Sequence, residues 1–231
     1  MLKNIVADQF RILAFQRTSS GIALHWKQYL FFGLIVTWLA GIGRYWDNPK
    51  AHVLQHAGLG SLAYVFVLAM LLWLVYLPLK PSKWQFKNVL LFITLCSLPA
   101  LLYAIPVERF MPLESAQSVN AWFLGVVATW RVALLGVFLN RVALLRPIVV
   151  FVATLLPLVL IVTTLTLLNL EHVVFDIMAG IRPEDKSPND MAYTVVLVIS
   201  FYSMMVLPIL LIAYGILVYK VRKSSTSQSI T

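Results

Sequence analysis

Six long apolar segments, joined by short polar connections, constrain this chain more than any other feature. A helix needs about 20 apolar residues to cross ~30 Å of hydrocarbon, and most of these segments approach or exceed that length. Only 12% of the 231 residues are charged, against roughly 25% in a soluble domain. The sequence therefore predicts an all-α, polytopic helical membrane protein. The predicted spans are Gln28–Gly43, Ala57–Leu79, Asn88–Pro106, Val119–Leu139, Pro147–Leu168 and Tyr193–Tyr219.

The two ends of the chain are more polar than its centre. Residues 1–27 are predicted to be a cytoplasmic amphipathic segment, in which residues 2–17 mix apolar and charged side chains at roughly helical spacing and so predict a helix at the membrane interface. Packing of this helix beneath the bundle is an equal alternative. Residues 28–219 are then a single six-helix transmembrane domain, and residues 220–231 a basic, Ser/Thr-rich cytoplasmic tail.

The distribution of basic residues predicts the orientation, because Lys and Arg in short loops favour the cytoplasmic side. With both termini inside, twelve basic residues lie inside and five outside. The five predicted outside are Arg44, Lys50, Arg109, Arg182 and Lys186. The compact layout favours a bacterial inner membrane. The net charge of +9 is spread over several loops, so nucleic acid is not an expected partner.

Arg131 is the first candidate for a functional residue. It lies about 12 residues into the fourth span, hence ~18 Å along a helix, and none of the six spans contains Asp or Glu. A cation at that depth costs ~2.5–3.5 kcal/mol on insertion scales. Its counterpart is therefore a hydroxyl of the fifth span, a carbonyl released by proline, a lipid phosphate or an anionic ligand. The alternatives are that Arg131 extends to the inner headgroups or only joins helices.

The predicted outer side carries a second group of candidates. Arg44, Asp47, His52 and His56 lie in or beside the first outer loop, and Glu108 follows the third span. His52 and His56 share a helix face if the next helix begins early. Zinc requires three or four converging ligands, and the sequence does not show that these side chains converge. No metal or other cofactor is therefore predicted. Solvated side chains at the membrane interface are the alternative reading of this group.

Prolines interrupt three of the predicted spans. Pro99, Pro157 and Pro208 lack an N–H, which leaves the carbonyls of Leu95, Ala153 and Met204 without their helical partners. Kinked helices of this kind line binding sites in transporters, but proline is also common in ordinary membrane helices.

Together these features favour a non-enzymatic membrane protein, either a small permease-like protein or an accessory subunit that handles a small or lipid-derived anion. The predicted binding residues are Arg131, Arg44, Asp47, His52, His56 and Glu108. One alternative is a structural or assembly scaffold without a substrate. Another is an enzyme that acts on a lipid-linked substrate at the outer face. Membrane lipids are expected partners, with a membrane protein or a second copy of the chain as further candidates.

Overall fold

The computed structural model describes residues 1–19, 21–46, 52–82, 84–170, 174 and 191–228. Helices supply the regular structure of these residues, and no strand occurs among them, which confirms the all-α class. The α-helices are α1 (Leu2–Leu13), α2 (Gly21–Leu24), α3 (Trp26–Gly43), α4 (Val53–His56), α5 (Leu59–Tyr76), α6 (Phe86–Leu95), α7 (Leu113–Arg141), α8 (Pro147–Leu167) and α10 (Met191–Gln228). Three short 3-10 helices are η1 (Leu77–Leu79), η2 (Leu98–Ala104) and η3 (Val107–Arg109).

Four helical segments of this part of the chain are long and apolar enough to cross a membrane: Leu59–Leu79, Ser118–Arg141, Pro147–Leu167 and Thr194–Lys223. A fifth is obtained if α6 and η2, which are bent by 43° at their junction, form one broken span. Helix α3 coincides with the predicted first span but is not in this set, because Lys27 and Gln28 in its first turn lower its hydropathy. Six spans therefore stay a prediction.

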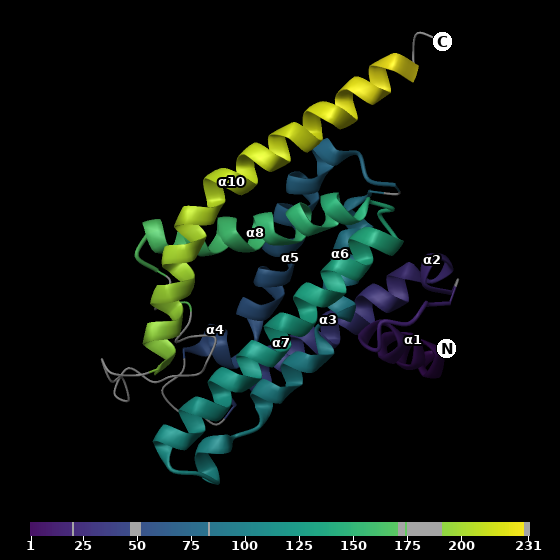
Figure 1. Cartoon of the computed structure of the whole chain (residues 1–231). Coiled ribbons are helices and arrows are strands. Elements are labelled where there is room, and N and C mark those ends of the chain that lie inside the picture. Colours follow the sequence, from purple (N-terminus) through teal and green to yellow (C-terminus); the bar gives the residue numbers. More distant parts are fainter. Residues whose placement is uncertain (20, 47–51, 83, 171–173, 175–190, 229–231) are drawn as a thin grey trace. The chain divides into compact units, whose positions relative to one another are not determined.

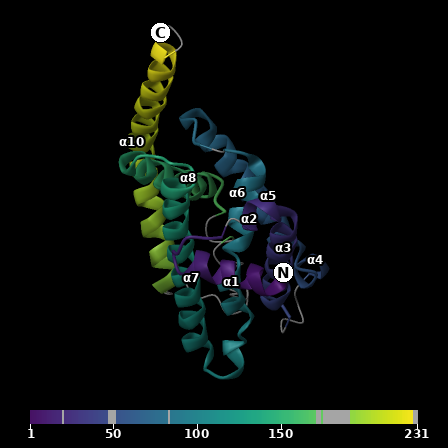
Figure 2. The ribbon, with the colours of Figure 1, turned by 90° about the vertical axis from the view of Figure 1, so that its right-hand side faces the viewer.

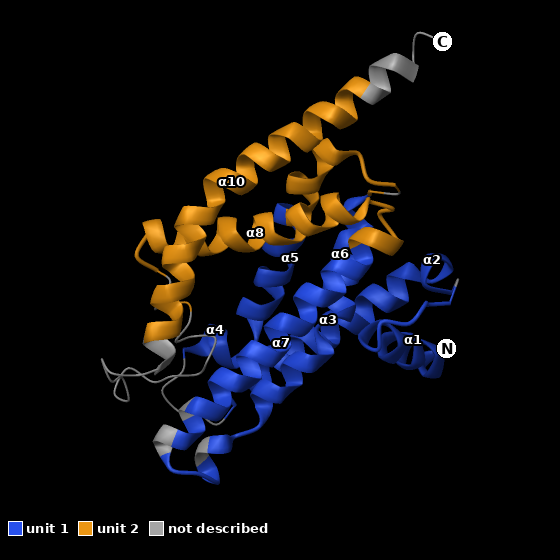
Figure 3. Cartoon of the chain, viewed as in Figure 1, with its two compact units in different colours: residues 1–71, 85–138 blue, residues 72–84, 139–231 orange. Residues whose placement is uncertain are grey.

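The chain divides into two compact units, shown in Figure 3. Unit 1 comprises residues 1–71 and 85–138, and unit 2 comprises residues 72–84 and 139–231. Each unit therefore draws on segments that are distant in the sequence.

In unit 1, helix α3 packs along α6 and η2 (Figures 1 and 2). A Cβ atom on Gly33 would lie 2.7 Å from Thr94, so the glycine permits a close approach of α3 and α6. Near the far end of both elements, Trp46 Nε1 donates a hydrogen bond to the Ala104 carbonyl over 3.0 Å. The start of α3 meets the start of α6, and the end of α3 meets the end of η2. Helix α3 therefore runs parallel to the segment formed by α6 and η2.

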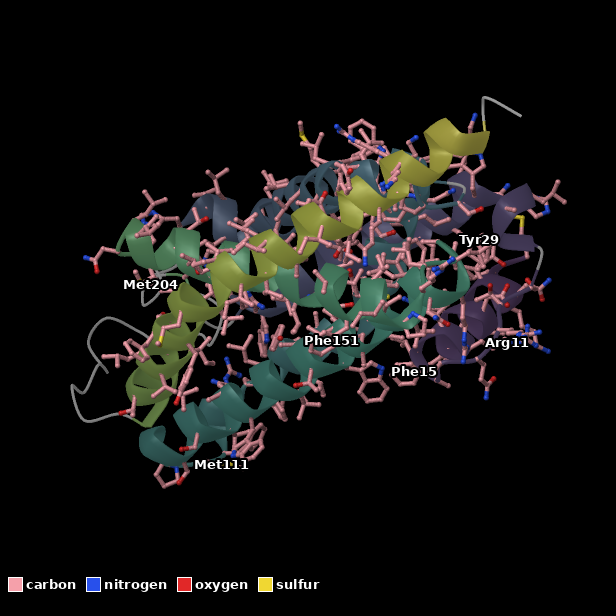
Figure 4. All side chains as sticks on the ribbon, turned by 45° about the horizontal axis from the view of Figure 1, so that its top comes forward. Arg11, Phe15, Tyr29, Met111, Phe151 and Met204 are labelled. Carbon is pink, nitrogen blue, oxygen red and sulfur yellow. The ribbon has the colours of Figure 1, made fainter. Side chains whose placement is uncertain are left out.

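Helix α1 also packs within unit 1. Its buried side chains are Ile5, Asp8, Gln9 and Leu13, and Ile5 clusters with Tyr29 of α3 and with Leu91 and Leu95 of α6. Arg11 and Tyr29, labelled in Figure 4, both hydrogen-bond to the Asp8 carboxylate. These contacts support the alternative of packing against the bundle, whereas an interfacial position stays a prediction.

Unit 2 is built on the packing of α8 against α10. Its core contains Val152 and Leu156 of α8 and Leu210 of α10. Helix α10 contains Pro208 and changes direction partway along its length (Figure 1). It continues through Gln228, beyond the predicted end at Tyr219, so the predicted start of the tail lies within a helix.

Many large apolar side chains of the helices point away from their unit. Phe151 is 61% exposed and Met204 is 44% exposed (Figure 4). In each of the four long apolar segments, only 17–28% of the most hydrophobic stretch of 18 residues is buried inside the structure. Apolar surface of this extent suits contact with lipid, and it is compatible with insertion into a membrane.

Candidate functional site

Two arginines and a tyrosine meet in unit 1. Arg44 directly follows α3 and is its C-cap, Tyr103 lies in η2, and Arg131 lies in α7. The Arg44 guanidinium carbon is 4.5 Å from the centroid of the Tyr103 ring. The positive charges of Arg44 and Arg131 both act electrostatically on the Tyr103 hydroxyl. We refer to Arg44, Tyr103 and Arg131 as the arginine cluster.

Arg131 is held at the break between α6 and η2. Its Nε donates a hydrogen bond to the Cys96 carbonyl over 3.3 Å. That carbonyl is available because the chain tightens at this point: the Ala100 N–H bonds to the Ser97 carbonyl instead of continuing the α-helical pattern to Cys96. Among the carbonyls released by the break near Pro99, one therefore accepts from Arg131. The sequence predicted a carbonyl released by proline as one possible counterpart and named those of Leu95, Ala153 and Met204, whereas the structure shows the neighbouring Cys96 carbonyl.

The preceding carbonyl is also occupied. Pro99 has no N–H to bond to the Leu95 carbonyl, and Gln9 Nε2 of α1 donates to that oxygen over 3.1 Å. Gln9 is 1% exposed, so this amide is committed to the helix break. Two consecutive carbonyls thus receive side chains from α1 and α7. The sequence identified the Leu95 carbonyl as unsatisfied but did not identify Gln9 as its donor.

Arg44 is only partly satisfied by hydrogen bonds, one of which joins its side chain to that of Tyr45. Its Nε is buried without a hydrogen-bond partner among the residues that the structure describes, although a guanidinium carries five N–H donors. Stacking on the Tyr103 ring offsets part of this cost. Burial lowers the pKa of Arg44 from its ordinary value, and the charge of Arg131 acts in the same direction, against the opposing effects of Tyr45 and Tyr103. The guanidinium keeps its proton nevertheless.

Carboxylates do not balance the arginine cluster in the part of the chain described here. Asp8 is the single carboxylate whose side chain the structure describes, and it accepts hydrogen bonds from Arg11, Ser19 and Tyr29. The spans themselves contain no acidic residue. Two cations held near each other in apolar surroundings create a positive potential that attracts an anion.

The other predicted binding residues have different positions. Asp47 lies outside the described residues, and so does the side chain of Glu108, whose backbone belongs to η3. His52 is the N-cap of α4 and His56 is its last residue, and the His52 N–H donates to Gln55 Oε1 over 2.9 Å. Within the described residues, no three His, Cys, Asp or Glu side chains are grouped to hold a metal.

Aromatic residues connect the same end of unit 1. The Arg109 guanidinium carbon lies 4.8 Å from the Trp46 ring centroid, and Trp46 bonds to Ala104, which follows Tyr103. Tyr103 was not among the predicted site residues. The sequence contains no pattern that identifies Tyr103 as a site residue. Only the packing of α3 on η2 brings its ring against the Arg44 guanidinium.

Comparison of the chain with protein-family models, with curated proteins and with solved structures found no match.

Proposed function

We propose that this chain is an integral membrane protein that binds a small or lipid-derived anion at the arginine cluster. The observation that supports this proposal best is that Arg44 stacks on Tyr103 while the charge of Arg131 acts on both residues, with no carboxylate near them among the described side chains. Guanidinium groups recognise phosphate and carboxylate groups through paired hydrogen bonds. An anion that carries such a group would relieve the repulsion between the two cations.

The arginines have donors to offer. Across the residues that the structure describes, the Arg131 side chain makes one hydrogen bond, through Nε, which leaves its two Nη groups for a ligand. Arg44 contributes its unpartnered Nε. Tyr103 adds an aromatic ring and a hydroxyl to the same place. In surroundings of low polarity, such charge-assisted hydrogen bonds are stronger than in water.

A scaffold without a ligand is the second candidate, and one observation favours it. Arg131 joins α7 to the break after α6, while the neighbouring Trp130 Nε1 donates to the Leu13 carbonyl at the end of α1 over 3.0 Å. In this alternative the arginine only connects helices. Replacement of Arg131 by Leu would then preserve or improve stability and leave partner binding intact.

Ligand-dependent stability distinguishes the two candidates. The full-length protein, purified in a neutral detergent, is heated with inorganic phosphate or with a short-chain phosphatidic acid, at ionic strength matched with chloride. A ligand that binds the folded protein raises its apparent Tm in proportion to RT ln(1 + [L]/Kd). We expect the wild-type protein to gain stability with one of these ligands, and R44Q and R131Q to lose that gain.

The matched control is R141Q, which removes a positive charge from the same helix ten residues further on. It should respond to the ligand as the wild-type protein does. A response to phosphate would indicate a soluble anion, whereas a response to phosphatidic acid alone would indicate a lipid. If the ligand stabilised R44Q and R131Q as much as the wild-type protein, the proposal of an anion site at the arginine cluster would be wrong.

Uptake measurements separate a permease from an accessory subunit. Proteoliposomes with the purified chain alone should accumulate the bound anion if it is a permease, and R131Q should abolish that accumulation. Binding without uptake would favour an accessory subunit. A bacterial inner membrane with both termini in the cytoplasm is the location we propose for either role, on the distribution of basic residues.

A further inference from the structure

A second cluster of positive charge lies at the opposite end of α3 from the arginine cluster. The ammonium groups of Lys27 and Lys87 both lie over the ring of Trp26, at 5.9 and 5.6 Å from its centroid. Lys27 belongs to α3 and Lys87 to α6, so the packing of these two helices creates the pair. Both lysines are exposed. We refer to Trp26, Lys27 and Lys87 as the lysine cluster.

The surface around the lysine cluster is one-sided in charge. Residues 1–28 and 85–88 of unit 1 contain a single acidic residue, Asp8. Its side chain is 1% exposed and its carboxylate is taken up by Arg11, Ser19 and Tyr29. Folding therefore removes the one negative charge from this surface and leaves the exposed lysines without a described counter-ion.

Exposed apolar side chains adjoin the same cluster. Leu24, just before α3, is 77% exposed, and Phe31, in the second turn of α3, is 68% exposed. Tryptophan prefers the headgroup level of a bilayer, and lysine there extends its ammonium group toward phosphates. Apolar residues beside a tryptophan with two exposed ammonium groups are typical of a surface that contacts both acyl chains and headgroups.

We propose that the lysine cluster binds the headgroups of acidic phospholipids in the membrane leaflet beside the start of α3. The proposal rests on charge complementarity: two like charges from different helices share one ring, and a lipid phosphodiester between them would neutralise their repulsion. Trp26 fixes the depth of the site, while Lys27 and Lys87 select negative over zwitterionic lipids. This site is separate from the arginine cluster and does not depend on it.

Lipid titration of the full-length protein tests this proposal. Binding of phosphatidylglycerol and of phosphatidylcholine to the protein in neutral detergent is measured by native mass spectrometry at low ionic strength. We expect the wild-type protein to prefer phosphatidylglycerol. Each basic residue near an anionic surface contributes about fivefold in affinity, so K27Q/K87Q should weaken phosphatidylglycerol binding by ~25-fold and leave phosphatidylcholine binding unchanged.

Two further variants make the result interpretable. K220Q/K223Q removes two exposed lysines from α10 and should keep the preference, whereas an equal loss there would show a general charge effect and overturn the proposal. K27R/K87R keeps both charges and should keep binding, even if K27Q/K87Q folds poorly.

Competition by equimolar inorganic phosphate would also overturn the lipid assignment. The K27Q/K87Q variant should keep the thermal response of the arginine cluster to inorganic phosphate, so this site and the anion site can fail separately.

Discussion

Asp8 is the residue in which burial and charge conflict most clearly. It is 1% exposed, yet it accepts hydrogen bonds from the hydroxyls of Ser19 and Tyr29, the Ser19 N–H and the Arg11 guanidinium. Burial alone would raise its pKa, but these hydrogen bonds outweigh that effect, so the pKa is lowered from its ordinary value. Asp8 thus ties α1 to the Ser19 linker and to α3.

The lowered pKa predicts how the docking of α1 depends on pH. A carboxylate with a depressed folded-state pKa stabilises the fold above its unfolded pKa of about 3.9, and that stabilisation is lost as pH falls through the folded value. The D8N variant lacks this carboxylate. We expect its thermal stability to be lower near neutral pH and to change less than the wild-type stability between pH 6 and pH 3. Equal acid sensitivity in both proteins would contradict this role.

Gln9 is expected to stabilise the break between α6 and η2. The Q9L variant would leave the buried Leu95 carbonyl without a donor, at a cost of about 1–3 kcal/mol. Gln16 is exposed in the same segment, so Q16L is the matched control and should change stability little. Chemical or thermal unfolding of both variants in detergent measures the difference. If Q9L were as stable as Q16L, the Gln9–Leu95 hydrogen bond would not contribute.

At the scale of secondary-structure elements, proline decides where the helices need outside partners. The sequence predicted that Pro157 would leave the Ala153 carbonyl unsatisfied, and the structure places the Tyr76 hydroxyl 2.7 Å from that oxygen as a donor. Tyr76 is fully buried. The break at Pro99 follows the same pattern, with Gln9 as the donor to Leu95. Both prolines thus become points of attachment for another helix.

A double-mutant cycle tests the connection between Tyr76 and Pro157. We expect Y76F to lose about 1–3 kcal/mol of stability, because the Ala153 carbonyl is then buried without a donor. In the P157A background residue 157 regains an N–H that can bond to Ala153, so Y76F should cost less there. Tyr202, which is 62% exposed on α10, provides the control variant Y202F. A cost for Y76F that is the same in both backgrounds would contradict the proline-dependent role.

At the scale of the whole molecule, the number of membrane crossings is the main prediction still to be tested. The parallel packing of α3 against α6 and η2 supports six spans, because both start at one end and finish at the other. If α6 and η2 together cross the membrane, α3, which packs along both of them, is expected to cross the membrane beside them. The polar first turn of α3 is the reason that hydropathy alone does not establish this crossing.

Labelling of single introduced cysteines tests the six-span topology. The native Cys96 is buried, so a membrane-impermeant maleimide applied to intact cells should not reach it. With six spans, cysteines introduced at His52 and Ser115 should react from outside, and those at Arg17 and Lys220 should react only after the cells are opened. If α3 does not cross, Arg17 and His52 will react from the same side.

The sequence by itself determined the helical class, the apolar segments and the absence of acidic residues from the spans, because these depend on composition and on local periodicity. It also located the carbonyls released by Pro99 and Pro157. Only the tertiary structure decided which donors reach them, and only it brought Arg44, Tyr103 and Arg131 together. Gln9 and Leu95 are 86 positions apart. Contacts over such separations depend on how whole helices pack, and helical periodicity identifies the face that packs but not its partner.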